Sequence, residues 1–177
     1  RVKMEKYRFI FFIPKESFSD MIVGKGNIIR RASNWIEVDT KTDDLDFGFS
    51  IASGSGTEEV CVFRTVEKES ERNLDLEDGF KLIEEEKYWL GHEFFETFWR
   101  RTSGDVSSFF HDLVLICVSM VHFQMGSKNN YERLFRQAIK DLSRLGAKEL
   151  ENQSFSYPLD SNVILTLRRM AKDLAIT

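Results

Sequence analysis

The chain has 177 residues, of which 42% are hydrophobic and 13% aromatic, and its formal net charge is −4. This length fits one ordinary domain or two small ones, with enough apolar material for a packed core. With only 2 Pro and 10 Gly, the composition excludes a fibrous repeat and a disordered chain. Acidic and basic residues are mixed along the sequence, so no general electrostatic attraction for nucleic acid or anionic membrane is expected.

The cysteines and the first apolar run indicate where the protein resides. Cys61 and Cys117 lie in separate apolar segments without metal-binding or redox spacing, which favours two small buried side chains in a reducing compartment. The apolar run at residues 9–13 is too short for a signal peptide or a membrane span, and Pro14 closes it. We therefore expect a soluble, cytoplasmic protein without a membrane partner.

The first part of the chain predicts a small antiparallel sheet with one helix. Residues 7–13 form a nearly continuous aromatic and aliphatic run, which is typical of a buried strand. Ser17 can cap a helix that runs toward Arg31. Three further strands are predicted from short apolar or alternating runs at residues 34–39, 46–52 and 60–63.

From residue 74 onward the apolar residues repeat with the period of a helix. Five helices are predicted, at residues 75–88, around 88–99, at 106–125, at 130–145 and at 160–175. Asp75, Asp105 and Asp160 are the expected N-terminal caps. The helix at 106–125 is apolar nearly all round but holds His111, Asp112 and His122, so we expect a buried core helix rather than a membrane span.

These patterns predict an α+β protein of two units. Residues 1–72 form the small sheet unit, and residues 73–177 form a mostly antiparallel five-helix bundle, because short loops join the long helices. The charged run Glu67–Arg72 is taken as the boundary. A solvated helix start is an equally good interpretation of that run.

The segment Tyr88–Trp99 places polar groups among many aromatic rings. On a helix His92 and Glu96 stand four residues apart and share one face. If the two helices on either side of residue 103 form an antiparallel hairpin, His111 lies beside Glu96. A cluster of His92, Glu96 and His111 is then within reach, with Glu93 or Asp112 nearby.

The predicted cluster has two interpretations. A metal or acid–base site would use His92, Glu96 and His111 as ligands, with Glu93 and Glu96 as the candidate catalytic carboxylates. A buried hydrogen-bond network would let His92 and Glu96 satisfy each other and fix the helix register. We favour the network, because neither the second His of a zincin nor the repeated Glu-x-x-His of a di-iron bundle is present. No resident cofactor is therefore predicted, and a divalent metal is the alternative.

The helical half resembles a known family. The order Lys87-Tyr88-Trp89 followed by His92-Glu93-x-x-Glu96-x-x-Trp99 is similar to that of the helical family catalogued as domain of unknown function 309. The turn at His122–Gly126 and the entry Pro158-Leu159-Asp160 also fit, so the resemblance covers roughly residues 74–175. It implies a compact helical bundle with no assigned activity. Where that family usually has Gln-Gly, this chain has His111-Asp112.

Three functions remain open at this point, and whether the protein is an enzyme is one of the open questions. The leading hypothesis is an interaction or ligand-binding helical module. Self-association of this module through exposed aromatic side chains would produce a homo-oligomer. The second is a metal-dependent, hydrolase-like enzyme centred on His92, Glu96 and His111. The third is single-strand nucleic-acid binding through aromatic side chains of the sheet and pairs of arginines. Its residues are Trp35, Phe47, Phe49, Arg30–Arg31, Arg100–Arg101 and Arg168–Arg169. Nucleic acid is not the expected partner, because such pairs usually face solvent and such aromatics usually lie in a core.

Overall fold

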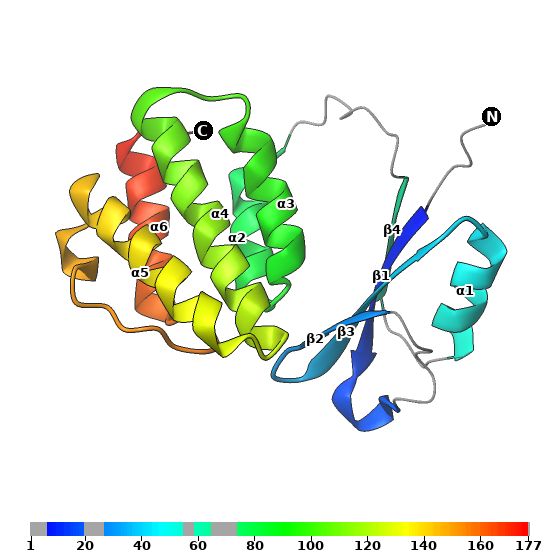
Figure 1. Ribbon diagram of the computed structural model, residues 1–177. Coiled ribbons are helices and arrows are strands. Elements are labelled where there is room, and N and C mark those ends of the chain that lie inside the picture. The colour runs from blue at the N-terminus through cyan, green and yellow to red at the C-terminus, as the bar shows by residue number, and fades with distance from the viewer. Residues whose placement is uncertain (1–6, 20–26, 55–58, 65–73, 177) are drawn as a thin grey trace. The chain divides into compact units, whose positions relative to one another are not determined.

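The structure is a computed structural model that describes residues 7–19, 27–54, 59–64 and 74–176 (Figure 1). The chain divides into two compact units, residues 1–72 and 73–177. Within the described ranges the first unit contains a four-stranded antiparallel sheet and one α-helix, and the second contains five α-helices. The α+β class, with a small sheet before a helical bundle, is therefore confirmed.

The sheet of the first unit has the strand order β2-β3-β1-β4. Its strands are β1 (Tyr7–Pro14), β2 (Ile28–Arg31), β3 (Trp35–Thr42) and β4 (Glu59–Arg64). Phe11 of the central strand lies opposite Val38 of β3 and Val60 of β4. Because side chains alternate between the two faces, one face gathers a buried apolar core of Phe9, Phe11, Ile13, Ile36 and Val38.

The opposite face of the sheet carries an ion-pair network. Arg30 is only 1% exposed, and its guanidinium donates hydrogen bonds to Glu37 at 2.6 Å and to Asp39 at 3.0 Å. Arg8 also donates to Asp39. Buried charges of this kind are tolerated because each one is paired.

Two of the predicted elements of the first unit are wrong. Residues 46–52 belong to a helix, α1 (Leu45–Gly54), rather than to a strand. A Cβ atom at Gly48 would lie 2.3 Å from the Phe9 ring, so the bare glycine lets the helix backbone lie directly on that ring. Three alternating apolar residues are too few to distinguish a strand from a short helix.

The helix predicted from Ser17 toward Arg31 is the second error. The structure has a short 3₁₀ helix, η1 (Lys15–Ser17), at its beginning and β2 at its end. Residues 20–26, in the middle of that prediction, and the predicted boundary at 67–72 lie outside the described residues. The other three predicted strands are confirmed as β1, β3 and β4.

The helical unit follows its sequence pattern closely. It contains α2 (Leu76–Glu84), α3 (Tyr88–Trp99), α4 (Gly104–Gln124), α5 (Lys128–Arg144), the 3₁₀ turn η2 (Lys148–Leu150) and α6 (Ser161–Asp173). Asp75 and Asp160 cap α2 and α6 as predicted, accepting backbone N–H groups at 3.0 and 2.7 Å. Asp105 is not a cap, because α4 already begins at Gly104.

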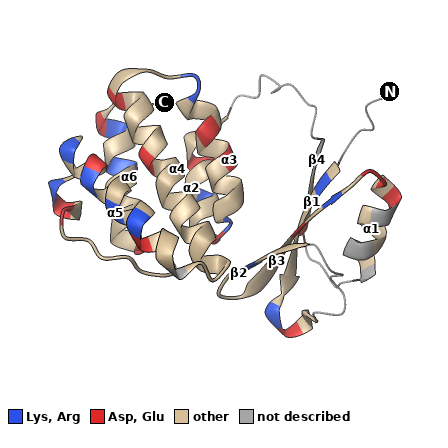
Figure 2. Cartoon of the chain, viewed as in Figure 1, with Lys and Arg blue, Asp and Glu red and all other residues tan. Residues whose placement is uncertain are grey.

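The central helix of this unit is α4, which lies between α3 and α5 (Figure 1). Most of α4 carries no charge (Figure 2), and its fully buried side chains include Phe109, Phe110, Leu113, Ile116 and Met120. Among the described residues it is the helix whose length and composition would suffice to cross a membrane. Half of that apolar stretch is buried inside the bundle, which is the environment of a core helix.

Candidate functional site

His92 on α3 stands between two carboxylates. Its Nδ1 lies 3.3 Å from Glu93 Oε1, and its Nε2 lies 3.6 Å from Glu96 Oε2. The second oxygen of Glu96 accepts a hydrogen bond of 2.6 Å from Arg100. The side chains of His92 and Glu96 are each 23% exposed and that of Glu93 is 48% exposed. This is therefore a linked polar network, although it is partly exposed rather than buried.

The same three side chains are the candidate metal ligands on α3. Donor atoms of His92, Glu93 and Glu96 all lie within 4.8 Å of one another. However, the two carboxylates face different nitrogens of one imidazole. Glu96 is also held by Arg100. Since zinc sites use three or four convergent ligands, this arrangement fits a metal poorly.

The structure does not bring His111 to Glu96. The His111 ring lies against Trp99, with a centroid distance of 4.8 Å, and Phe110 stacks on Phe98 at 4.9 Å. These pairs place His111 against the residue one helical turn beyond Glu96 on α3. His111 therefore sits about one helical turn from its expected level, and the predicted metal set of His92, Glu96 and His111 does not form.

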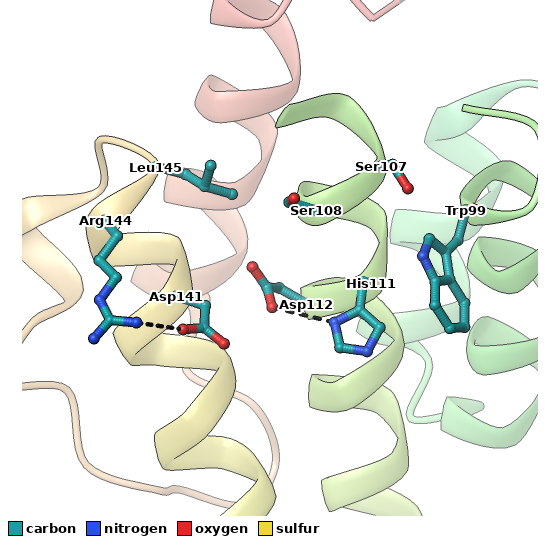
Figure 3. A pocket seen from close by; sticks show the side chains of 8 residues that line it. All are labelled: Trp99, Ser107, Ser108, His111, Asp112, Asp141, Arg144 and Leu145. Carbon is teal, nitrogen blue, oxygen red and sulfur yellow. Dashed lines mark hydrogen bonds and ion pairs between the residues drawn. The ribbon is translucent and has the colours of Figure 1, made fainter. Parts of the chain in front are cut away.

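A pocket of about 370 Å³ opens beside His111 instead (Figure 3). It lies between α4 and α5, with Trp99 of α3 at one side. Its lining residues are Trp99, Ser107, Ser108, His111, Asp112, Asp141, Arg144 and Leu145. Three of the residues singled out from the sequence, Trp99, His111 and Asp112, thus line one pocket, whereas His92, Glu93 and Glu96 do not.

Asp112 is a buried acidic residue of this pocket. It is 2% exposed, and its Oδ1 lies 3.7 Å from His111 Nδ1. In the described part of the chain, its Oδ2 has no hydrogen-bond partner. Burial, helped by the charge of Asp141, raises the pKa of Asp112 to about 7. Near neutral pH this carboxyl group therefore exists in both its protonated and its ionised form.

Asp141 faces Asp112 from α5 and was missed by the sequence reasoning. Figure 3 shows the two carboxylates on neighbouring helices, with Asp141 also 3.3 Å from Arg144. The sequence did contain a signal for it: Asp141 follows Leu134 and Ala138 at helical spacing and precedes Leu145, so it interrupts an apolar stripe. In the structure its side chain is 35% exposed and its ion-pair partner is Arg144.

Several of the residues proposed for nucleic-acid binding lie on another element than expected or are held in ion pairs. Phe47 and Phe49 lie on α1 and not on a strand beside Trp35. Arg30 is buried in its ion pairs, and Arg168 donates to Glu77 and Glu84 at 2.6 and 2.7 Å. Arg169 is likewise held by Glu149 and Asp173. Guanidinium groups neutralised in this way offer little attraction to phosphates.

The helical unit belongs to the class of small α-helical bundles with a polar pocket between helices. Residues 76–134 match the family described as a domain of unknown function (DUF309), which confirms the resemblance of the helical part to that family. The match spans α2, α3, α4 and the start of α5, and the first unit matches no family. Comparison with curated proteins and with solved structures gave no match. His111 and Asp112 lie inside the matched region, whereas Asp141 and Arg144 lie beyond it.

Proposed function

We propose that the helical unit is a ligand-binding module whose site is the pocket between α4 and α5. The observation that supports this most directly is the buried Asp112 oxygen without a partner on the pocket wall. A buried polar atom left unsatisfied costs about 1–3 kcal/mol, and a bound hydrogen-bond donor would remove that cost. A volume of about 370 Å³ lies at the lower end of the range for ligand sites, so the ligand is small.

Binding is a better match to the pocket than hydrolysis. A nucleophile needs a base within hydrogen-bond reach, but the Ser108 hydroxyl donates to the Gly104 carbonyl oxygen at 3.2 Å, within its own helix. His111 is directed at Asp112 and packs on Trp99. Ser107 also lines the pocket, but the described residues show no hydrogen bond between it and His111. The lining residues thus provide acceptors and an aromatic wall, and no serine is paired with a base.

The test is a fragment screen read by the tryptophan side chains. The chain has 3 Trp, and of these Trp99 lines the pocket, while Trp89 and Trp35 do not. In a ¹H–¹⁵N spectrum of the full chain, a bound fragment should shift the Trp99 indole signal and leave the Trp89 signal in place. Single Trp→Phe variants assign the three signals. A diverse library of small polar fragments that shifts no Trp99 signal would contradict the proposal.

A divalent metal on α3 is the second candidate, and the observation that favours it is the proximity of the His92, Glu93 and Glu96 donor atoms. Elemental analysis of the full chain after metal-supplemented expression tests the idea directly. The expected result for a true site is one equivalent of metal that is lost in His92→Ala. Background metal at equal levels in both proteins would remove this candidate.

A further inference from the structure

We infer that the ligand of the α4–α5 pocket is a small organic cation, with an ammonium group held between Asp112 and Asp141. The inference rests on the proposed function and adds the chemical class of the ligand. It starts from the two carboxylates that line one pocket from different helices. An ammonium group carries three hydrogen-bond donors and no acceptor, so it is complementary to acceptors that face each other.

The charged residues around the pocket favour a ligand of positive charge. Asp141 is close enough for its charge to disfavour ionisation of Asp112. A cation between them removes that repulsion, whereas an anion would add a third negative charge. Arg144 is the cation already present, but its side chain is 66% exposed and its contact is with Asp141. The inner carboxylate, Asp112, has His111 at 3.7 Å from its Oδ1, but among the described residues its Oδ2 has no hydrogen-bond partner.

The remaining walls favour an organic cation over a metal ion. The group of metal-type donors that the described residues bring together lies on α3 and does not include Asp112 or Asp141. The His111 ring lies between Asp112 and the indole of Trp99 (Figure 3), so Trp99 closes the side of the pocket away from the two carboxylates. Leu145 adds an apolar surface for a short carbon chain. A primary amine on a short alkyl chain matches both the charge and the apolar contacts.

Binding of such a cation must release a proton when Asp112 is protonated. With a pKa of about 7, Asp112 is roughly 3% ionised at pH 5.5 and roughly 90% ionised at pH 8. If the cation binds only the ionised form, its affinity rises roughly 30-fold over this range. The other charged and titratable groups facing Asp112 are His111 on α4 and Asp141 and Arg144 on α5. A His111→Gln variant separates the contribution of the imidazole.

The experiment compares three probes of equal size on the full chain: butylamine, 1-butanol and butyrate. Dissociation constants are measured by titration of the Trp99 indole signal at pH 5.5 and pH 8. We expect butylamine to bind at least tenfold tighter than the other two at pH 8, and to lose that advantage at pH 5.5. Asp112→Asn should abolish the pH dependence, and Asp141→Asn should weaken amine binding at pH 8. Asp78→Asn on the exposed side of α2 is the matched control and should behave as the native chain does.

The probe titrations distinguish a failure of the cation inference from a failure of the proposed ligand-binding function. If butanol or butyrate shifts Trp99 at the same concentrations as butylamine at pH 8, the pocket binds ligands but not cations in particular, and the inference is overturned. If none of the three probes shifts Trp99 and the fragment screen also fails, the proposed function fails with it. Because the comparison of probes uses the native chain, the result does not depend on the folding of any variant.

Discussion

Replacing Asp112 by Asn should make the protein more stable at alkaline pH and leave its stability unchanged at acid pH. The pKa of this carboxyl is about 7 in the folded chain and 3.8 as its ordinary value. Between these two values the unfolded chain loses the proton while the folded chain keeps it, so folding becomes less favourable as the pH rises. Above pH 7 both states are ionised and the loss is complete.

The magnitude follows from the size of the pKa difference. A shift of roughly three units at 1.36 kcal/mol per unit gives about 4 kcal/mol as the upper limit of the penalty at pH 8. Asn has the shape of a protonated Asp and cannot ionise, so Asp112→Asn avoids this penalty. We expect the variant to be more stable than the native chain by about 2–4 kcal/mol at pH 8, and equal to it near pH 4.

Urea denaturation followed by circular dichroism at 222 nm measures this difference at pH 4, 5, 6, 7 and 8. Glu37 in the first unit also has a raised pKa, because it is buried. For that reason only the difference between the native chain and the variant is informative, since the contribution of Glu37 cancels. Asp141→Asn is the control for the electrostatic part and should recover a fraction of the gain. A native-minus-variant difference that is constant from pH 4 to 8 would refute the reasoning.

Three further substitutions test individual contacts by the same denaturation assay. Tyr88→Phe removes the buried hydroxyl oxygen that accepts the Leu159 N–H at 3.0 Å. It should lower the free energy of unfolding by about 1–3 kcal/mol, because a buried donor is left unsatisfied. No measurable loss of stability would show that water replaces the hydroxyl. Gly48→Ala brings a methyl group to within 2.3 Å of the Phe9 ring and should lower the free energy of unfolding by about 1–3 kcal/mol. A gain in stability would mean that α1 moves away from the ring without cost. Glu96→Ala breaks a partly exposed network and should cost less than about 1 kcal/mol, and a larger loss would indicate a tighter structural role.

The helical unit was predictable because each helix carries its own signals. Long apolar stripes at the helical period and the caps at Asp75 and Asp160 are local features, and all five helices follow from them. The first unit was predictable only where a strand is continuous, as in β1. The helix α1 packs with Gly48 close to the ring of Phe9, and these two residues are far apart in sequence. A propensity pattern carries no information about such a contact.

The candidate site was only half visible in the sequence, for two physical reasons. The level of His111 relative to α3 depends on where the hairpin turns, and a shift of one residue moves a side chain by about 100° around its helix. The opposing carboxylate, Asp141, lies on another helix, so its relation to Asp112 exists only after packing. What the sequence did show was an acid inside an otherwise apolar helix, at the position where the resembling family has a glycine.

Asp112 is a buried acid in a core helix, and it is either a tolerated structural feature or the anchor of a ligand. Stability measurements distinguish these two explanations. If Asp112 is only a tolerated structural feature, a small amine will leave the free energy of unfolding unchanged at every pH. If it is the anchor of a ligand, butylamine will stabilise the native chain by RT ln(1 + [L]/Kd), about 1.4 kcal/mol at a tenfold excess over Kd. That gain should be present at pH 8, absent at pH 5.5, and absent in Asp112→Asn at both. Stabilisation of equal size in the variant would place the amine elsewhere on the protein and leave the acid without a ligand-binding role.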